Sequence, residues 1–170
     1  AIGGKDSMSG TFENLHVPPT VVAFALNTMK AGEAISSEFK YANSKVYAIE
    51  ALYDANDLPH FSNLNRNYER VHALMQSRRV FSASSVGMGG IAAALTKMCF
   101  GNDIGFKFAP GAIKFEDLFR PAYGTMLIEM SEAVNVTEAL AGVKWTLLGR
   151  TTAVASVVCN GMVQTLDELR

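Results

Sequence analysis

The segment that most constrains the fold is a short apolar strand followed by glycines and an amphipathic helix. Residues 80–86 form the predicted strand, and Gly87-Met88-Gly89-Gly90 leads out of it. Apolar residues then recur at helical spacing, at Ile91, Ala94, Leu95, Met98 and Cys99. This spacing predicts a helix with one buried face, ended by Gly101 and Asn102. A strand that feeds a helix in this way favours a layered α/β domain.

Other segments extend the same pattern. We predict further strands at residues 20–26, 45–52, 104–108, 125–130, 145–148 and 153–158. The run 20–26 is apolar without interruption, so we expect it to be covered on both faces. Helices are predicted at residues 67–78, 114–120 and 135–141, and residues 54–65 are predicted to be a loop. The predicted fold class is α/β (α+β), a mixed sheet with helices packed on it.

Charge and cysteine content exclude several classes of protein. The 170 residues carry a net charge of -1, which gives no reason to expect nucleic acid or an anionic membrane as partner. No apolar run approaches the roughly 20 residues needed to cross a bilayer. Cys99 and Cys159 make neither a metal-ligand set nor a disulfide framework, so we expect reduced thiols and a cytoplasmic protein. No catalytic triad or metal-ligand spacing is visible, so no catalytic residue and no metal ligand is assigned.

The strand–glycine–helix unit is the first candidate site. Glycines at such a turn let backbone N–H groups approach a phosphate, and the start of the helix is electropositive. The candidate nucleotide- or phosphate-binding residues are Ser84, Ser85, Gly87, Gly89 and Gly90. The same glycines would also be explained by a tight turn alone.

The second candidate site is the opening segment, residues 3–9 (GGKDSMS). Lys5 could hold a phosphate, Asp6 a Mg²⁺-bound water, and Ser7 adds a hydroxyl. The segment lacks the spacing of a Walker A loop, and a solvated loop is the alternative.

Three segments resemble one family in the same order along the chain. They are residues 1–26 (AIGGKDSMSGTFENLHVPPTVVAFAL), 68–102 (YERVHALMQSRRVFSASSVGMGGIAAALTKMCFGN) and 118–130 (LFRPAYGTMLIEM). They resemble the second synthetase half of the large, single-chain phosphoribosylformylglycinamidine synthase (formylglycinamide ribonucleotide amidotransferase). GGKDSMS is quite specific for that enzyme. The strand–GG–helix pattern is shared with aminoimidazole ribonucleotide synthetase and its relatives.

This resemblance implies a domain organisation and a function. Residues 1–12 would be the last strand and loop of a preceding N-terminal-type domain. Residues 13–170 would form a C-terminal-type synthetase domain, with the fold of the C-terminal domain of aminoimidazole ribonucleotide synthetase. The parent would be a glutamine-dependent, ATP-dependent ligase of purine biosynthesis acting on formylglycinamide ribonucleotide. Its ATP, its Mg²⁺ and its partners, the N-terminal-type synthetase domain and the glutaminase domain, are likewise implied by the resemblance.

The chain departs from the family at the glycine loop. Ser85 stands where the family has a metal-binding Asp, Gly87 replaces a Ser, and Lys97 occupies a position that is usually Glu. A neutral hydroxyl is a poor ligand for Mg²⁺. We therefore expect no tightly bound cofactor and no catalysis in the isolated chain. A relative such as aminoimidazole ribonucleotide synthetase and a stand-alone small-ligand-binding or dimerisation module are the alternatives.

Overall fold

The computed structural model describes residues 2–7 and 10–170, and the chain divides into two compact units, Ala1–Ala34 and Ile35–Arg170. The predicted boundary after residue 12 concerns the domains of a longer protein and stays a prediction. Of the opening motif, Met8 and Ser9 lie outside the described residues.

The first unit consists of two short antiparallel ladders. β1 (Gly3–Ser7) pairs with β4 (Thr20–Phe24), and β2 (Gly10–Phe12) pairs with β3 (Leu15–Val17). A short 3-10 helix at Ala31–Glu33 closes the unit. The strand predicted at residues 20–26 is confirmed, but its predicted burial on both faces is wrong, since all of β4 is exposed. The reason is that a two-stranded ladder offers no second layer within its own unit.

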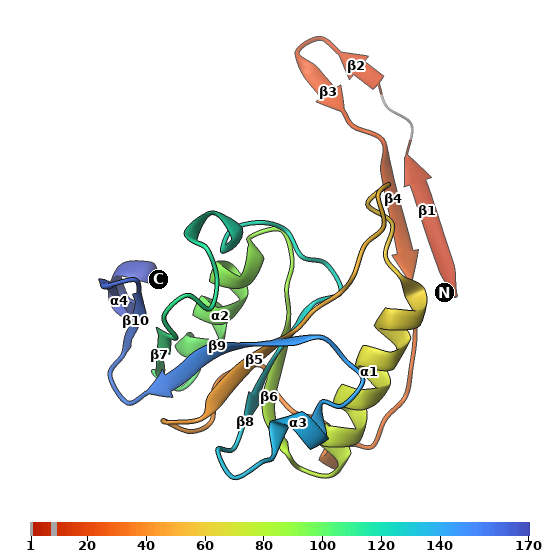
Figure 1. The fold of residues 1–170 in the computed structure, drawn as a ribbon. Helices are drawn as coiled ribbons and strands as arrows, with labels where there is room; N and C mark the ends of the chain where they lie inside the picture. The colour runs from red at the N-terminus through yellow and green to blue at the C-terminus, as the bar shows by residue number, and fades with distance from the viewer. Residues whose placement is uncertain (1, 8–9) are drawn as a thin grey trace. The chain divides into compact units, whose positions relative to one another are not determined.

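The second unit is built on a seven-stranded sheet with the order β11-β10-β7-β9-β5-β8-β6 (Figure 1). The strands are β5 (Lys45–Ile49), β6 (Val80–Ser85), β7 (Gly105–Phe108), β8 (Met126–Met130), β9 (Trp145–Thr152), β10 (Ser156–Cys159) and β11 (Met162–Thr165). Neighbouring strands are antiparallel except β10 and β7, which are parallel. The predicted mixed sheet is therefore confirmed.

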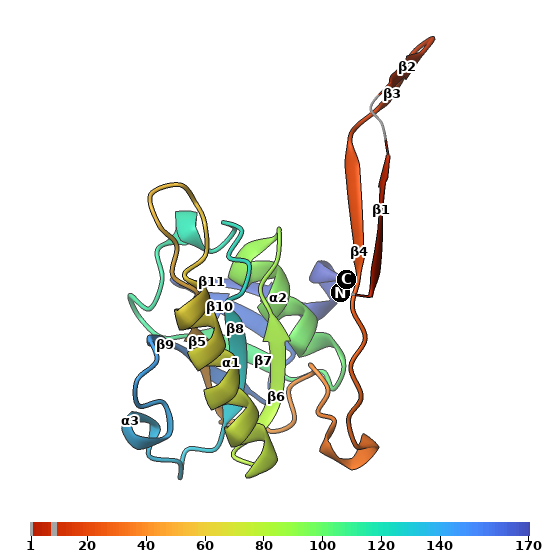
Figure 2. The same ribbon diagram turned by 90° about the vertical axis from the view of Figure 1, so that its right-hand side faces the viewer.

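Helices cover both faces of this sheet. α1 (Phe61–Gln76) and α3 (Val136–Ala139) pack on one face, and α2 (Gly90–Phe100) and α4 (Leu166–Leu169) pack on the other (Figures 1 and 2). β5 shows how the strands serve both layers, because Val46 and Ala48 join the α2 layer while Tyr47 and Ile49 join the α1 layer. No helix among residues 2–7 and 10–170 has the length and apolar character needed to cross a membrane.

Several elements differ from the sequence-based expectation, and the segment predicted as a helix at residues 114–120 forms only a 3-10 helix at Phe115–Asp117. α1 begins at Phe61, so the predicted loop at residues 54–65 is wrong in its last part. Two asparagines in the first turns of α1 hydrogen-bond to the backbone that follows β5. Asn63 accepts the Leu52 N–H at 2.9 Å, and Asn67 donates to the Glu50 carbonyl at 2.9 Å. β11 and α4 at the C-terminal end were not predicted.

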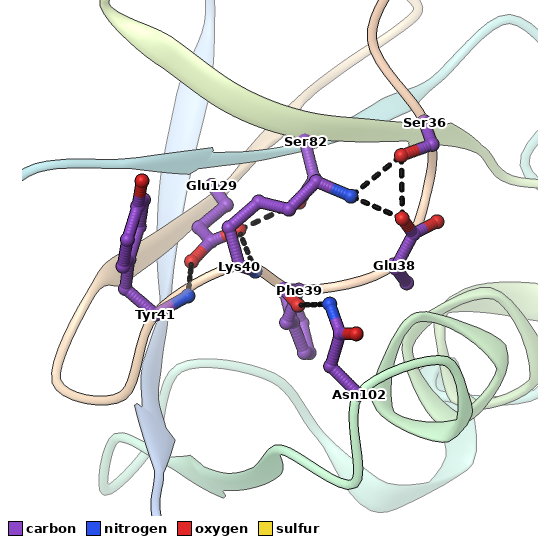
Figure 3. A network of polar contacts seen from close by, with 8 residues as sticks. All are labelled: Ser36, Glu38, Phe39, Lys40, Tyr41, Ser82, Asn102 and Glu129. Atoms are coloured by element: carbon purple, nitrogen blue, oxygen red, sulfur yellow. Dashed lines mark hydrogen bonds and ion pairs between the residues drawn. The ribbon is translucent and has the colours of Figure 1, made fainter.

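A buried carboxylate ties the segment Ser36–Tyr41, here called the strap, to the sheet (Figure 3). Glu129 of β8 is fully buried and accepts the N–H groups of Lys40 and Tyr41 at 2.9 and 3.0 Å. The hydroxyl of Ser82 on β6 donates to the same carboxylate at 2.8 Å. Both oxygens of this buried group are therefore hydrogen-bonded, as its desolvation requires.

Both cysteines carry free thiols. Cys99 is buried in the core, and burial raises the pKa of its thiol to about 12. Cys159 is half-buried on β10.

Candidate functional site

The predicted strand–glycine–helix unit forms at an edge of the sheet. β6 is an outer strand that pairs only with β8 and ends at Ser85. The next residue, Val86, is buried and donates its N–H to the Thr125 carbonyl at 2.9 Å. The glycine loop (Gly87–Gly90) therefore starts from a fixed strand end and leads directly to the start of α2.

Gly90 is required by the shape of this turn. Its φ is +67°, and a Cβ there would lie 2.4 Å from the Leu118 carbonyl oxygen and 2.8 Å from that of Arg120. Its own N–H donates to the Gly87 carbonyl at 3.1 Å. The expectation that the Gly90 N–H is open to an anion is therefore corrected, because that N–H closes the turn.

Part of the helix start remains open to a ligand. The Ala92 N–H is taken by the Leu118 carbonyl at 2.9 Å. Among the described residues, the N–H groups of Gly89 and Ile91 have no hydrogen-bond acceptor. Together with the positive end of α2, these two groups are able to receive an anion. Ser84 is half-buried and Ser85 is exposed at the end of β6, just before the glycine loop.

The glycine loop does not offer the ligand atoms that Mg²⁺ prefers. The side-chain oxygens that precede it, at the end of β6, are the neutral hydroxyls of Ser84 and Ser85, whereas Mg²⁺ prefers anionic oxygens. Across residues 2–7 and 10–170, no three His, Cys, Asp or Glu side chains gather where they could hold a metal ion. No step through a metal ion is therefore assigned to this loop.

The second predicted site lies in the first unit. Lys5, Asp6 and Ser7 form the end of β1, opposite Val22, Val21 and Thr20 of β4. Lys5 and Asp6 are exposed. Because neighbouring residues of a strand point to opposite faces, the two charged side chains lie on opposite sides of the ladder. The predicted roles of Lys5 with a phosphate and of Asp6 with a Mg²⁺-bound water stay predictions.

A cavity of about 380 Å³ lies beside the start of α2. Ile91 forms part of its wall, β5 and β9 contribute Ala48, Thr146 and Leu148, and Glu50 lines it directly after the end of β5. Members of the segment 112–125 complete it, among them Asp117 and Arg120. No pattern along the sequence identified this cavity, since its walls come from four separate segments that only the sheet order brings together.

The charged side chains that line this cavity already have hydrogen-bond or ionic partners. Glu50 accepts a hydrogen bond from the Thr146 hydroxyl at 2.5 Å and pairs with Lys144 at 2.6 Å. Arg120 pairs with Asp117 at 3.2 Å. The cavity is thus a polar pocket whose three charged lining residues each have an ionic partner, Lys144 serving Glu50 from outside the lining.

The sequence matches no family model and no curated protein. The structure, however, is similar to solved structures. Phosphoribosylformylglycinamidine synthase II (PurL) from Thermotoga maritima superposes with a TM-score of 0.68 at 12% identity, covering 83% of this chain and 28% of that one. The same enzyme complexed with FGAR gives a TM-score of 0.64 at 11% identity, with 89% and 30% covered. The chain has the fold of PurL.

The structure is also similar to that of a kinase. Thiamine monophosphate kinase from Aquifex aeolicus gives a TM-score of 0.54 at 10% identity, covering 77% of this chain and 54% of that one. The predicted likeness to the aminoimidazole ribonucleotide synthetase type of fold is confirmed by these neighbours. The chain spans less than a third of the length of the PurL structures that it matches.

Proposed function

We propose that this chain is a domain of a PurL-like, ATP-dependent ligase of purine biosynthesis. The parent enzyme would convert formylglycinamide ribonucleotide to formylglycinamidine ribonucleotide, with glutamine as the source of ammonia. The observation that carries the proposal is the PurL fold, found in a chain whose GGKDSMS motif resembles the same enzyme. Solved PurL structures include complexes with ATP, ADP and FGAR, which supports a nucleotide and this ribonucleotide as ligands of the parent.

In this proposal the glycine loop receives phosphate oxygens. The N–H groups of Gly89 and Ile91 and the hydroxyls of Ser84 and Ser85 would donate to them, while Gly87 and Gly90 shape the turn. Lys5 and Ser7 of the first unit would contact nucleotide in the parent enzyme. Other domains of the parent would supply the Mg²⁺ ligands, because the loop offers no carboxylate. Cytoplasmic location follows from the proposed pathway.

The function is tested by comparing the 170-residue chain with the protein encoded by its complete open reading frame. Both are incubated with ATP, Mg²⁺, ammonia and formylglycinamide ribonucleotide, and ribonucleotide-dependent ADP release is measured. We expect ADP release from the complete protein and none from the isolated chain. Turnover by the isolated chain would refute its proposed inactivity. A complete protein that gives no ribonucleotide-dependent ADP would refute the ligase.

A stand-alone binding or dimerisation module is the second candidate. It is favoured by the apolar side chains exposed on the first unit, such as Val21, Phe24 and Leu26, with exposed fractions of 83%, 55% and 76%. An open reading frame that begins at this segment, with a dimeric mass in sedimentation equilibrium, would support the module and contradict the ligase.

A further inference from the structure

Three basic residues lie in a row across three neighbouring strands of the sheet. Lys45 of β5 is directly opposite Arg150 of β9, and Arg150 is directly opposite Lys107 of β7. Residues directly opposite one another project from the same face, with Cβ atoms about 5 Å apart. Lys45 alternates with Tyr47 and Ile49, which places this basic row on the α1 face of the sheet.

Such an arrangement is unfavourable without an anion. Like charges directly opposite each other on adjacent strands destabilise a sheet. The net charge of the whole chain is only -1, so a general excess of basic residues does not explain the row. Among the described residues, Lys45 and Lys107 form no ion pair, and Arg150 pairs with Glu132. Three positive charges therefore face one carboxylate.

A cavity of about 320 Å³ opens beside the row. Lys107 and Arg150 line it, together with Asn43 and Thr152, and no carboxylate of the described chain is among its lining residues. Its apolar lining includes Pro110 and Leu147. This volume is at the small end of ligand pockets, which favours a small molecule.

Glu132 partly compensates the row from outside the cavity. It is half exposed, and the Arg150 guanidinium, with Lys45 close by, holds the pKa of its carboxyl below the usual range. The carboxylate therefore stays ionised at neutral pH and occupies one side of Arg150. An incoming anion would compete with it for the guanidinium.

We propose that the cavity beside Lys45, Arg150 and Lys107 binds the phosphate group of a small phosphorylated molecule. A guanidinium offers paired donors that match phosphate oxygens, and an ammonium adds a point charge. Asn43 and Thr152 supply further polar groups, and Pro110 and Leu147 an apolar surface for the rest of the molecule. This site is separate from the glycine loop and goes beyond the proposed ligase function.

The test is calorimetric titration of the 170-residue chain with pyrophosphate, inorganic phosphate and citrate at about 10 mM ionic strength, where charges are weakly screened. We expect pyrophosphate to bind more tightly than phosphate, and citrate to bind at least 10-fold more weakly than pyrophosphate. Lys107→Gln and Arg150→Gln should each weaken pyrophosphate binding about 10-fold. Lys97→Gln, which removes the same charge from an exposed position on α2, is the matched control and should leave the affinity unchanged.

Glu132→Gln separates binding from a merely structural role. Removing the competing carboxylate should tighten pyrophosphate binding several-fold, whereas loss of an ion pair that serves only the fold would not. Circular dichroism checks that each variant is folded, and Lys107→Met, which also removes the charge, replaces Lys107→Gln if the latter unfolds. Three results would overturn the site: no pyrophosphate binding at millimolar concentration, equal affinity in the Lys107 and Lys97 variants, or citrate binding as tightly as pyrophosphate. All are independent of ribonucleotide-dependent ADP release, so this site and the ligase function fail separately.

Discussion

At the scale of single residues, Gly90 and Glu129 contribute in ways that their residue types alone do not reveal. Gly90 combines a left-handed backbone with backbone atoms of the segment 118–120 packed against its Cα. Glu129 is an acidic residue inside the sheet, where its carboxylate takes the place of strand carbonyls as acceptor for the strap. In both cases the requirement comes from chain segments distant in sequence.

Gly90→Ala should destabilise the protein by about 3 kcal/mol, because it adds a steric clash to left-handed strain. Gly111→Ala is the matched control: Gly111 has a φ of +69° but no atom within 4 Å of an added Cβ. The control should cost only the backbone strain, about 1 kcal/mol. Urea unfolding of both variants measures the difference, and equal losses would contradict the packing role of the segment 118–120.

At the scale of elements, the strap is stabilised by an ion pair within it as well as by its hydrogen bonds to Glu129. Glu38 accepts a hydrogen bond from Ser36 at 2.5 Å and forms an ion pair with Lys40 (Figure 3). These contacts, led by Lys40, lower the pKa of Glu38 from 4.5 to about 2. A carboxyl whose pKa is depressed on folding contributes stability above its unfolded pKa and loses it as the pH falls through the folded one.

The strap should therefore weaken in acid. We expect the native chain to lose unfolding free energy relative to Glu38→Gln as the pH falls from about 4.5 to about 2, the interval between the unfolded and folded pKa values. Urea unfolding at several pH values measures this. Glu69→Gln, an exposed change on α1, is the control. Parallel curves for the native chain and Glu38→Gln would show that the Glu38 contacts contribute nothing to stability.

At the scale of the whole molecule, the two units differ in what holds them. Residues 2–6 and 10–34 are all exposed, whereas the second unit has two apolar layers around its sheet. A ladder of two strands is marginal in water by itself. The sheet of the second unit buries residues such as Val46, Leu127 and Ile128 completely.

Hydrogen exchange should report this difference. We expect amide hydrogens of β1 and β4 to exchange at rates near those of an unfolded peptide, and those of β5 and β8 to exchange orders of magnitude more slowly. A chain truncated to residues 35–170 should keep its urea midpoint. Strong protection of β1 and β4 in the isolated chain would contradict the marginal stability of the first unit. A lower urea midpoint after truncation would contradict the independence of the second unit.

Elements with strong local signals could be predicted from the amino-acid sequence alone. Helical spacing from Ile91 to Cys99 placed α2, and the apolar runs around Val46, Phe106 and Leu127 placed central strands, because side-chain periodicity follows directly from backbone geometry. The glycines of the loop marked the turn. Local pattern thus predicted the fold class and the position of the glycine loop.

How these elements contact one another became visible only in the folded chain. The strand order sets Lys45, Arg150 and Lys107 side by side and assembles the cavity beside Ile91 from distant segments. It also decided that β4 lies exposed in a two-stranded ladder and that the Gly90 N–H closes its own turn. These outcomes depend on which surfaces the rest of the chain supplies. The periodicity of one segment does not show which other segments will pack against it.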